Sequence, residues 1–160
     1  RAEPPDLQSL AYQELLRQVA DLGWFVHLHD HGARLAPAIA AIEPFGVRLV
    51  VEHFGRPTKE LGVDCPGFRA VLAALERGRT WVKLSAGFRL EPPDAPSRYA
   101  KKLLEVAGAE RLMWGSDWPF AAFEDKVKYA DTIADLERWV PDPSTRKTIC
   151  AETPLALYFS

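Results

Sequence analysis

A single carboxylate follows the most informative apolar run of this chain, in the stretch RLMWGSDWPF at positions 111–120. The run is too short for a helix, and a glycine and a serine separate it from Asp117. Pro119 cannot continue a strand because it has no N–H for the ladder. The pattern predicts a short buried strand that ends in an acid at the rim of a pocket, where the acid is positioned for chemistry. The alternative is that Asp117 caps a turn, since aspartate is common at such positions.

Polar side chains end three earlier apolar stretches in the same way. His27 and His29 close the first stretch, His53 closes the second, and Ser85 closes the third. In parallel α/β folds the loops that leave the carboxyl ends of the strands converge on one face and build the site. We therefore expect His29, His53 and Asp117 to share one pocket, with the serine contributing to substrate binding. For any one histidine the alternative is a hydrogen-bonded structural imidazole.

The spacing of the first two histidines also allows metal binding. Residues two apart on a strand share a face, so His27 and His29 should point the same way. Such a pair resembles a metal-ligand motif, but only His53 and Asp117 could supply the further ligands that a metal needs. The residues leave open whether one divalent ion, zinc or manganese, is bound or none.

Three arginines follow the predicted strand ends, namely Arg34, Arg56 and Arg89. A guanidinium in such a loop can hold a carboxylate through two parallel hydrogen bonds, which favours an anionic substrate. For Arg34 a surface salt bridge is the better interpretation. Arg56 fits either role, and Arg89 is expected to bind substrate because its loop should overhang the pocket.

Alternating periodicities predict the elements that position these residues. Apolar residues at helical spacing alternate with short apolar runs typical of strands. The predicted strands are Trp24–His29, Arg48–His53, Thr80–Ser85 and Leu112–Ser116. The predicted helices are Leu7–Leu22, Leu35–Phe45, Gly67–Arg77, Ser97–Ala107 and Phe123–Trp139, with a helical tail over Ser144–Phe159 interrupted near Pro154. Strands joined by crossover helices pair in parallel, so we predict an α/β fold with four βα units.

Composition limits the classes of partner. The formal net charge is −2 over 160 residues, so no basic surface for nucleic acid or anionic lipid is expected. No apolar run reaches the roughly 18–20 residues that span a bilayer. The two cysteines, Cys65 and Cys150, lie far apart without a CxxC motif or a nearby histidine pair, and indicate neither a disulfide framework nor a zinc knuckle. We expect a cytoplasmic protein with a small-molecule partner.

Taken in order, the motifs resemble those of a known family. The segments GWFVHLHDHG, VVEHFGRP, WVKLSAGFRL, RLMWGSDWPF and ETPLALYF are similar to the amidohydrolase superfamily. Within it they are most similar to the TIM-barrel hydrolases related to 2-pyrone-4,6-dicarboxylate lactonase and the sugar lactonases. The resemblance runs from about Leu15 to the C-terminus, and it implies a hydrolase that opens a carboxylated cyclic ester.

The resemblance also implies roles for individual residues. Asp117 matches the aspartate that activates water as general base, or that binds the metal in metal-dependent members. His53 matches a histidine that contacts the substrate carbonyl or the metal, and Arg89 matches an arginine that helps to bind a substrate carboxylate. His29 falls where the dicarboxylate lactonase has a polar residue that lines the pocket.

Two positions depart from the family pattern. Glu52 stands where an aspartate is usual before the histidine, and His27 stands where a glutamine is common. Fold resemblance alone also leaves open a related decarboxylase or amide hydrolase.

A complete TIM barrel has eight strands and typically about 250 residues. Residues 1–160 are therefore expected to form a single partial barrel domain, the C-terminal half with the last four βα units, as in an N-terminally truncated product. Open sheet edges at the first and last strands invite association, so a homo-oligomer is expected. A further possibility is that the isolated chain is catalytically inert, because half of the site would be missing.

Overall fold

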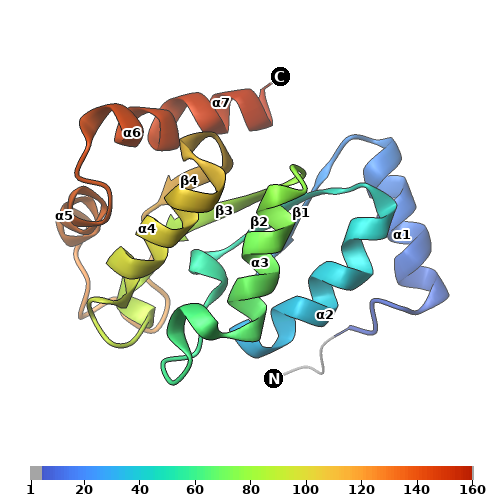
Figure 1. The fold of residues 1–160 in the computed structure, drawn as a ribbon, viewed down its shortest axis with the longest axis horizontal. Helices are drawn as coiled ribbons and strands as arrows, with labels where there is room; N and C mark the ends of the chain where they lie inside the picture. Colours follow the sequence, from blue (N-terminus) through green and yellow to red (C-terminus); the bar gives the residue numbers. More distant parts are fainter. Residues whose placement is uncertain (1–4, 160) are drawn as a thin grey trace.

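The computed structural model describes residues 5–159 and contains one four-stranded parallel sheet (Figure 1). The strands lie in the order β1-β2-β3-β4. Their bounds are Phe25–Leu28 for β1, Arg48–Val51 for β2, Thr80–Ser85 for β3 and Leu112–Gly115 for β4. The predicted α/β fold of four parallel strands with crossover helices is confirmed. Within the described residues, β1 and β4 each pair on one side only.

Helices cover one face of this sheet and flank its edges. In Figure 1, α2, α3 and α4 lie in front of the strands, α1 lies beyond the β1 edge, and α7 runs across one end. The helices are α1 Leu10–Asp21, α2 Gly32–Ile42, α3 Pro66–Glu76, α4 Ala95–Ala107, α5 Tyr129–Trp139, α6 Pro143–Lys147 and α7 Thr153–Tyr158. No helix within residues 5–159 is both long and apolar enough to cross a membrane. The cytoplasmic location stays a prediction.

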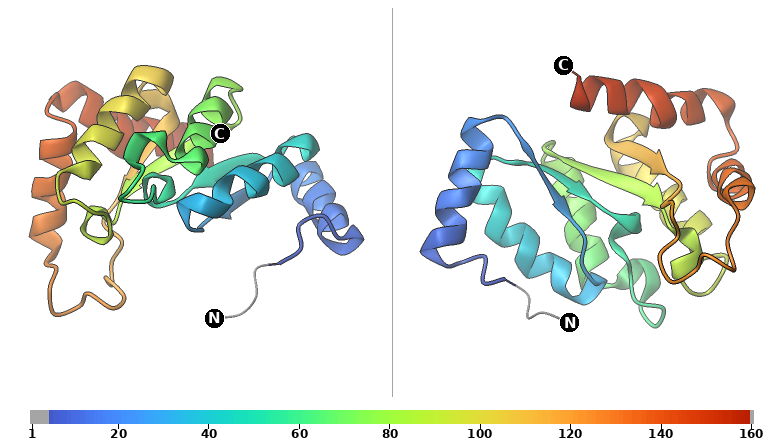
Figure 2. Two further views of the ribbon diagram at one scale, coloured as in Figure 1. Left: turned by 60° about the horizontal axis from the view of Figure 1, so that its bottom comes forward. Right: turned by 180° about the vertical axis from the view of Figure 1, so that it is seen from behind.

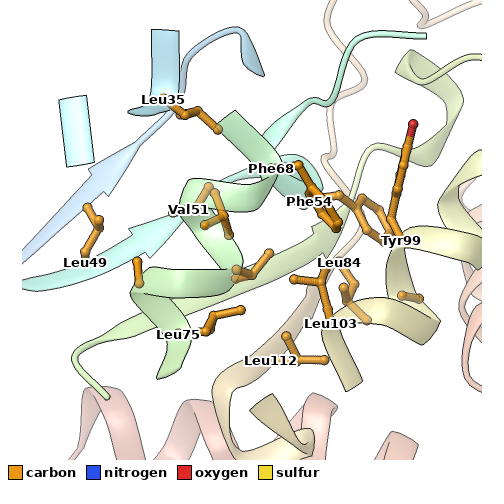
Figure 3. Close-up of a cluster of buried hydrophobic side chains, with 14 of the residues drawn as sticks. Leu35, Leu49, Val51, Phe54, Phe68, Leu75, Leu84, Tyr99, Leu103 and Leu112 are labelled. Atoms are coloured by element: carbon orange, nitrogen blue, oxygen red, sulfur yellow. The ribbon is translucent and has the colours of Figure 1, made fainter. Parts of the chain in front are cut away.

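The core fills the layer between the sheet and α2, α3 and α4 (Figure 3). Its members are apolar side chains from both layers, each at most 3% exposed: Leu35, Leu49, Val51, Phe54, Phe68, Leu75, Leu84, Tyr99, Leu103 and Leu112. Burial of each such side chain contributes about 1.5–3 kcal/mol. This packing holds the strands in place and so fixes where their carboxyl ends lie.

Among residues 5–159, the opposite face of the sheet is covered only at one end. Seen from behind in Figure 2, the strands lie in front of α2 and α3. Helix α7 contributes Leu157, which is buried against Val50 and Met113. Both faces of β2 are therefore buried, which explains its unbroken apolar run. Nearer the carboxyl ends this face carries polar side chains.

One predicted helix begins later than expected. The helix predicted over Phe123–Trp139 begins at Tyr129, because the preceding segment forms turns rather than a helix. Phe120 and Ala122 adopt left-handed backbone conformations, with φ of 63° and 68°. The helix then begins where the Asp131 carboxylate accepts the backbone N–H of residue 128 at 3.0 Å, one half of a capping box. Helical periodicity could not reveal this turn.

The remaining boundaries shift by a few residues. The interruption predicted near Pro154 is a π-helical segment over Thr148–Glu152, which ends two residues before that proline. Proline has no N–H for the carbonyl four residues earlier, so the preceding turn widens. The first helix begins at Leu10 rather than Leu7, and the second begins at Gly32. Strands β1, β2 and β4 end before their last predicted residue because the chain turns into the site there.

Candidate active site

The carboxyl ends of the strands bring the predicted polar residues together. His29 directly follows β1, and His53 lies two residues beyond β2 in a short 3₁₀ helix. Ser85 ends β3, and Asp117 lies two residues after β4. The parallel order of the strands places all four at one edge of the sheet, as expected from the sequence.

A chain of polar contacts joins these residues. Ser85 Oγ lies 2.7 Å from His53 Nδ1, within hydrogen-bond distance. On the other side of the ring, His53 Nε2 lies 3.5 Å from Asp117 Oδ1. The His29 ring packs edge-on against the His53 ring, with centroids 4.7 Å apart. The imidazole and the carboxylate are therefore close enough to contact the same small molecule.

Arg89 occupies the other side of the carboxylate. Its Nε donates to Asp117 Oδ2 at 2.8 Å, and its guanidinium also donates to the Ala121 carbonyl at 2.9 Å. The rings of Phe88 and Phe123, whose centroids are 5.1 Å apart, each lie about 5 Å from the guanidinium carbon. The arginine is thus held in one orientation, and Asp117 Oδ1 is the carboxylate oxygen that faces the imidazole.

Backbone strain marks the same strand ends. His53, Ala86 and Asp117 adopt left-handed conformations, with φ of 54°, 53° and 65°. A non-glycine residue in this region costs about 1–2 kcal/mol and persists only where the surrounding structure enforces it. Such strain clusters at functional sites. Nothing in the sequence indicated it, because none of the three positions is a glycine.

Burial determines the charge state of His53, which is 6% exposed. Desolvation lowers its pKa to about 4, with the charge of Asp117 opposing that shift and the His29 imidazole adding to it. The imidazole is therefore neutral near pH 7, so one ring nitrogen donates and the other accepts. The hydrogen bond to Ser85 decides which nitrogen carries the proton.

The two remaining arginines lie apart from this chain of contacts. Arg34 forms an exposed ion pair with Asp30, so its interpretation as a surface salt bridge is confirmed. Arg56 lines a cavity of about 380 Å³ beside the site, together with Lys59 and Arg89. Arg89 is the residue shared by this cavity and the His53 cluster. The cavity is large enough for a small ligand. Its lining carries three cationic side chains, two of them arginines, and the carboxylates of Glu60 and Glu91.

A second polar group lies on the same face of the sheet, one or two residues nearer the amino ends of the strands than the site. Glu52 Oε1 is 2.8 Å from His27 Nδ1 and 2.8 Å from Lys83 Nζ. Despite the cost of burial, these two partners lower the pKa of Glu52 to about 2, so its carboxylate is ionised. Sequence reasoning missed Lys83, although a lysine inside the apolar strand TWVKLS was a usable signal.

Comparison with known proteins agrees with this architecture. The family model described as Amidohydrolase matches residues 2–159. A 4-sulfomuconolactone hydrolase from Hydrogenophaga intermedia is 26% identical over 96% of this chain and 52% of its own length. A D-galactarolactone isomerase from Agrobacterium fabrum is 27% identical over 84% of this chain and 48% of its own length.

Solved structures superpose closely on the chain. A candidate 2-pyrone-4,6-dicarboxylic acid hydrolase from Pseudomonas putida shows 33% identity and a TM-score of 0.90, covering 98% of this chain and 59% of that one. A similar protein from Acinetobacter baumannii, solved with citric acid bound, shows 26% identity and a TM-score of 0.91 over 99% of this chain and 61% of that one.

The family match extends over nearly the whole chain, and the sheet with polar strand ends is consistent with it. The chain therefore belongs to the amidohydrolase family. It spans about half the length of the curated relatives that it matches.

Proposed function

We propose that this chain is the part of a lactone-acting hydrolase that carries its general base, and that the substrate is a small anionic cyclic ester. The observation that carries the proposal is the 3.5 Å approach of His53 Nε2 to Asp117 Oδ1 at the strand ends. The names of relatives support the substrate class, because they include hydrolases of sulfomuconolactone and of pyrone dicarboxylate.

The proposed reaction begins with proton transfer from water to Asp117 Oδ1. The resulting hydroxide attacks the lactone carbonyl, and His53 donates a hydrogen bond from Nε2 to the developing oxyanion while Ser85 Oγ donates to Nδ1. When the tetrahedral intermediate collapses, the ring C–O bond breaks and the leaving oxygen takes the proton from Asp117. The products are a hydroxy acid and the regenerated carboxylate.

Arg89 and Arg56 are proposed to bind the carboxylate of the substrate. Both line the 380 Å³ cavity, and the guanidinium of Arg89 is already oriented by its contacts. The citric acid bound to the Acinetobacter relative is consistent with a site that accepts carboxylates. His29 is proposed to contribute to substrate binding through its edge-on contact with the His53 ring. It lines the cavity of about 490 Å³ beside β1 rather than the one that contains Arg56 and Arg89.

Metal dependence stays a prediction. Residues 5–159 contain no group of three histidine, cysteine or acidic side chains that could hold a metal ion. His53 and Asp117 offer two donors, whereas a catalytic zinc site needs three protein ligands. These residues alone do not complete a site for zinc or manganese, and no step of the proposed reaction depends on one. A more distant amidohydrolase of the same fold was solved with zinc bound.

The test compares lactone turnover by the wild-type chain, Asp117→Asn and the control Asp21→Asn, which alters an exposed carboxylate on α1. We expect the first variant to lose about 10²–10⁴-fold in kcat and the control to retain activity. Undiminished turnover by Asp117→Asn would remove this residue from the base role. No turnover by the folded wild-type chain would favour the inert alternative.

A second candidate activity is lactone isomerisation, favoured by the relative named D-galactarolactone isomerase. A base at Asp117 could equally remove a proton from a hydroxyl of the substrate, whose oxygen then attacks the lactone carbonyl. The original ring C–O bond breaks, and the released oxygen takes the proton from Asp117. Product analysis separates the two activities, because hydrolysis consumes water and yields an open acid, whereas isomerisation yields another lactone of the same mass.

Association between copies is also proposed. The outer edge of β1 is unpaired within the described residues, and a cavity of about 490 Å³ runs along it between α2 and the segment before α1. Unpaired strand edges favour pairing with another chain. Light scattering after size exclusion should show a dimer or larger species at tens of micromolar, and a well-behaved monomer would contradict this.

A further inference from the structure

The three charged or titratable residues below the site form a network that spans three strands. Glu52 links His27 on β1 to Lys83 on β3 through one carboxylate oxygen. The carboxylate is 13% exposed and the lysine 27% exposed. The two positions that depart from the family pattern, 27 and 52, are thus bonded to each other.

The chain connects this network directly to His53 and Ser85. Glu52 directly precedes His53, and its backbone N–H donates to the Leu28 carbonyl at 3.0 Å, extending the ladder by one residue. Lys83 lies two residues before Ser85 on the same strand, so both side chains are on one face. Each residue of the His53–Ser85 hydrogen bond therefore lies one or two positions along the chain from a residue of the Glu52–Lys83 ion pair.

The C-terminal helix contributes a further contact. Tyr158 of α7 places its hydroxyl 3.5 Å from His27 Nε2, and its ring is nearly parallel to the imidazole at 13°. The network is thereby connected to the only helix that covers this face of the described sheet. Both nitrogens of His27 have polar neighbours.

We propose that Glu52 and Lys83 are positioning residues whose ion pair holds the end of β2 against β3 and so fixes the His53–Ser85 hydrogen bond. The carboxylate touches no reacting atom in the proposed reaction. Its effect passes through the backbone of residues 52 and 53, through the register of β3, and through the charge of Glu52, which acts directly on the His53 ring. This inference deepens the proposed function but can be tested without any activity.

A mere stabilising role is the competing explanation. Buried ion pairs often contribute little to stability relative to apolar replacements, whereas removing one partner leaves an uncompensated charge. The useful variants are therefore Glu52→Gln, Lys83→Met and the two combined. The double variant restores charge balance while removing the ion pair.

The experiment records long-range ¹H–¹⁵N NMR spectra of the histidine rings at one neutral pH in the 160-residue chain and these variants. The readout is the ratio of the two neutral tautomers of His53. We expect each single variant to change that ratio by about threefold to tenfold, the equivalent of one hydrogen bond. We expect the double variant to resemble the single variants, because the ion pair is absent from all three.

Two controls distinguish a specific change of the His53 tautomer ratio from general loss of structure. The signals of His31, an exposed residue away from the network, should not move. Glu14→Gln breaks an exposed ion pair with Arg17 and should leave His53 unchanged. Unchanged His53 signals in both single variants, additive changes in the double variant, or a return of the double variant to the wild-type ratio would overturn the proposal. Because no substrate is used, failure of the proposed lactone chemistry would not affect this result.

Discussion

Substitution of Gly67 by alanine should destabilise the fold far more than the size of a methyl group suggests. Gly67 lies in the first turn of α3, where it packs against Gly32 at the start of α2. A Cβ atom on Gly67 would lie 1.7 Å from the carbonyl oxygen of Gly32. The obstacle is backbone rather than a flexible side chain, so one helix must move.

The size of the effect follows from that overlap. Ordinary contact begins at 3.4 Å, so the two helices must separate by more than 1.5 Å at this point. Separation loosens the contacts of Leu35, Phe68 and Val71, all fully buried. Overpacking alone costs about 1–3 kcal/mol, and partial loss of this packing adds to it. We expect the free energy of unfolding to fall by about 3–5 kcal/mol, a large part of the roughly 5–15 kcal/mol typical of a domain.

The change should also reach the proposed site. The Gly32 backbone N–H donates to the Arg56 carbonyl at 3.0 Å, which anchors the loop that lines the cavity. A shift of α2 therefore moves Arg56. Binding of a carboxylate ligand such as citrate should weaken in Gly67→Ala even under conditions where the variant stays folded.

Urea unfolding monitored by circular dichroism measures the main effect. The matched control is Gly115→Ala in β4, where the added Cβ would meet only the Ser85 Cβ at 3.8 Å, an ordinary contact. The control should change the free energy by less than about 1 kcal/mol. A loss below 1 kcal/mol in Gly67→Ala with an unchanged m-value would refute the close approach of α2 and α3.

Three further outcomes are expected. Burial holds the pKa of His53 near 4 rather than its ordinary 6.5, so between these pH values the unfolded state binds more protons than the folded state. The free energy of unfolding should therefore fall by about 1–3 kcal/mol as the pH drops from 6.5 to 4. His53→Gln should reduce this dependence on pH, measured as the change of the urea midpoint with pH. Asp142→Ala removes the cap on the Thr145 N–H at 2.7 Å and should cost about 1 kcal/mol of unfolding free energy, whereas Asp142→Asn should retain most of it. Arg89→Met should weaken binding of a carboxylate inhibitor about 10–100-fold by calorimetry, and unchanged affinity would contradict its proposed role.

Much of the fold could be predicted from local patterns. Thr80–Ser85 was predicted at its observed boundaries, and the other strands and most helix starts differ by a few residues. Apolar periodicity and helix-ending glycines are local signals, so they can be read from the sequence without knowledge of the fold. The start of α5 was wrong because the preceding turn depends on left-handed residues that no local signal marks.

The candidate site could be predicted in its members but not in its contacts. Strand ends and residue types identified His53, Ser85 and Asp117. They did not show that the serine is buried against the imidazole, or that Arg89 pairs with the carboxylate. Both contacts join residues about thirty positions apart, so they depend on how neighbouring strands are aligned.

The amino-acid sequence by itself determined that four βα units would present histidines, a serine and an acid at one edge of a parallel sheet, because alternation and helix periodicity act over a few residues. Only the tertiary structure decided the strained backbone at His53 and Asp117 and the carboxylate of Glu52 shared between His27 and Lys83. These features arise where the packed helices fix the register of separate strands, and that register is a property of the whole core rather than of any one segment.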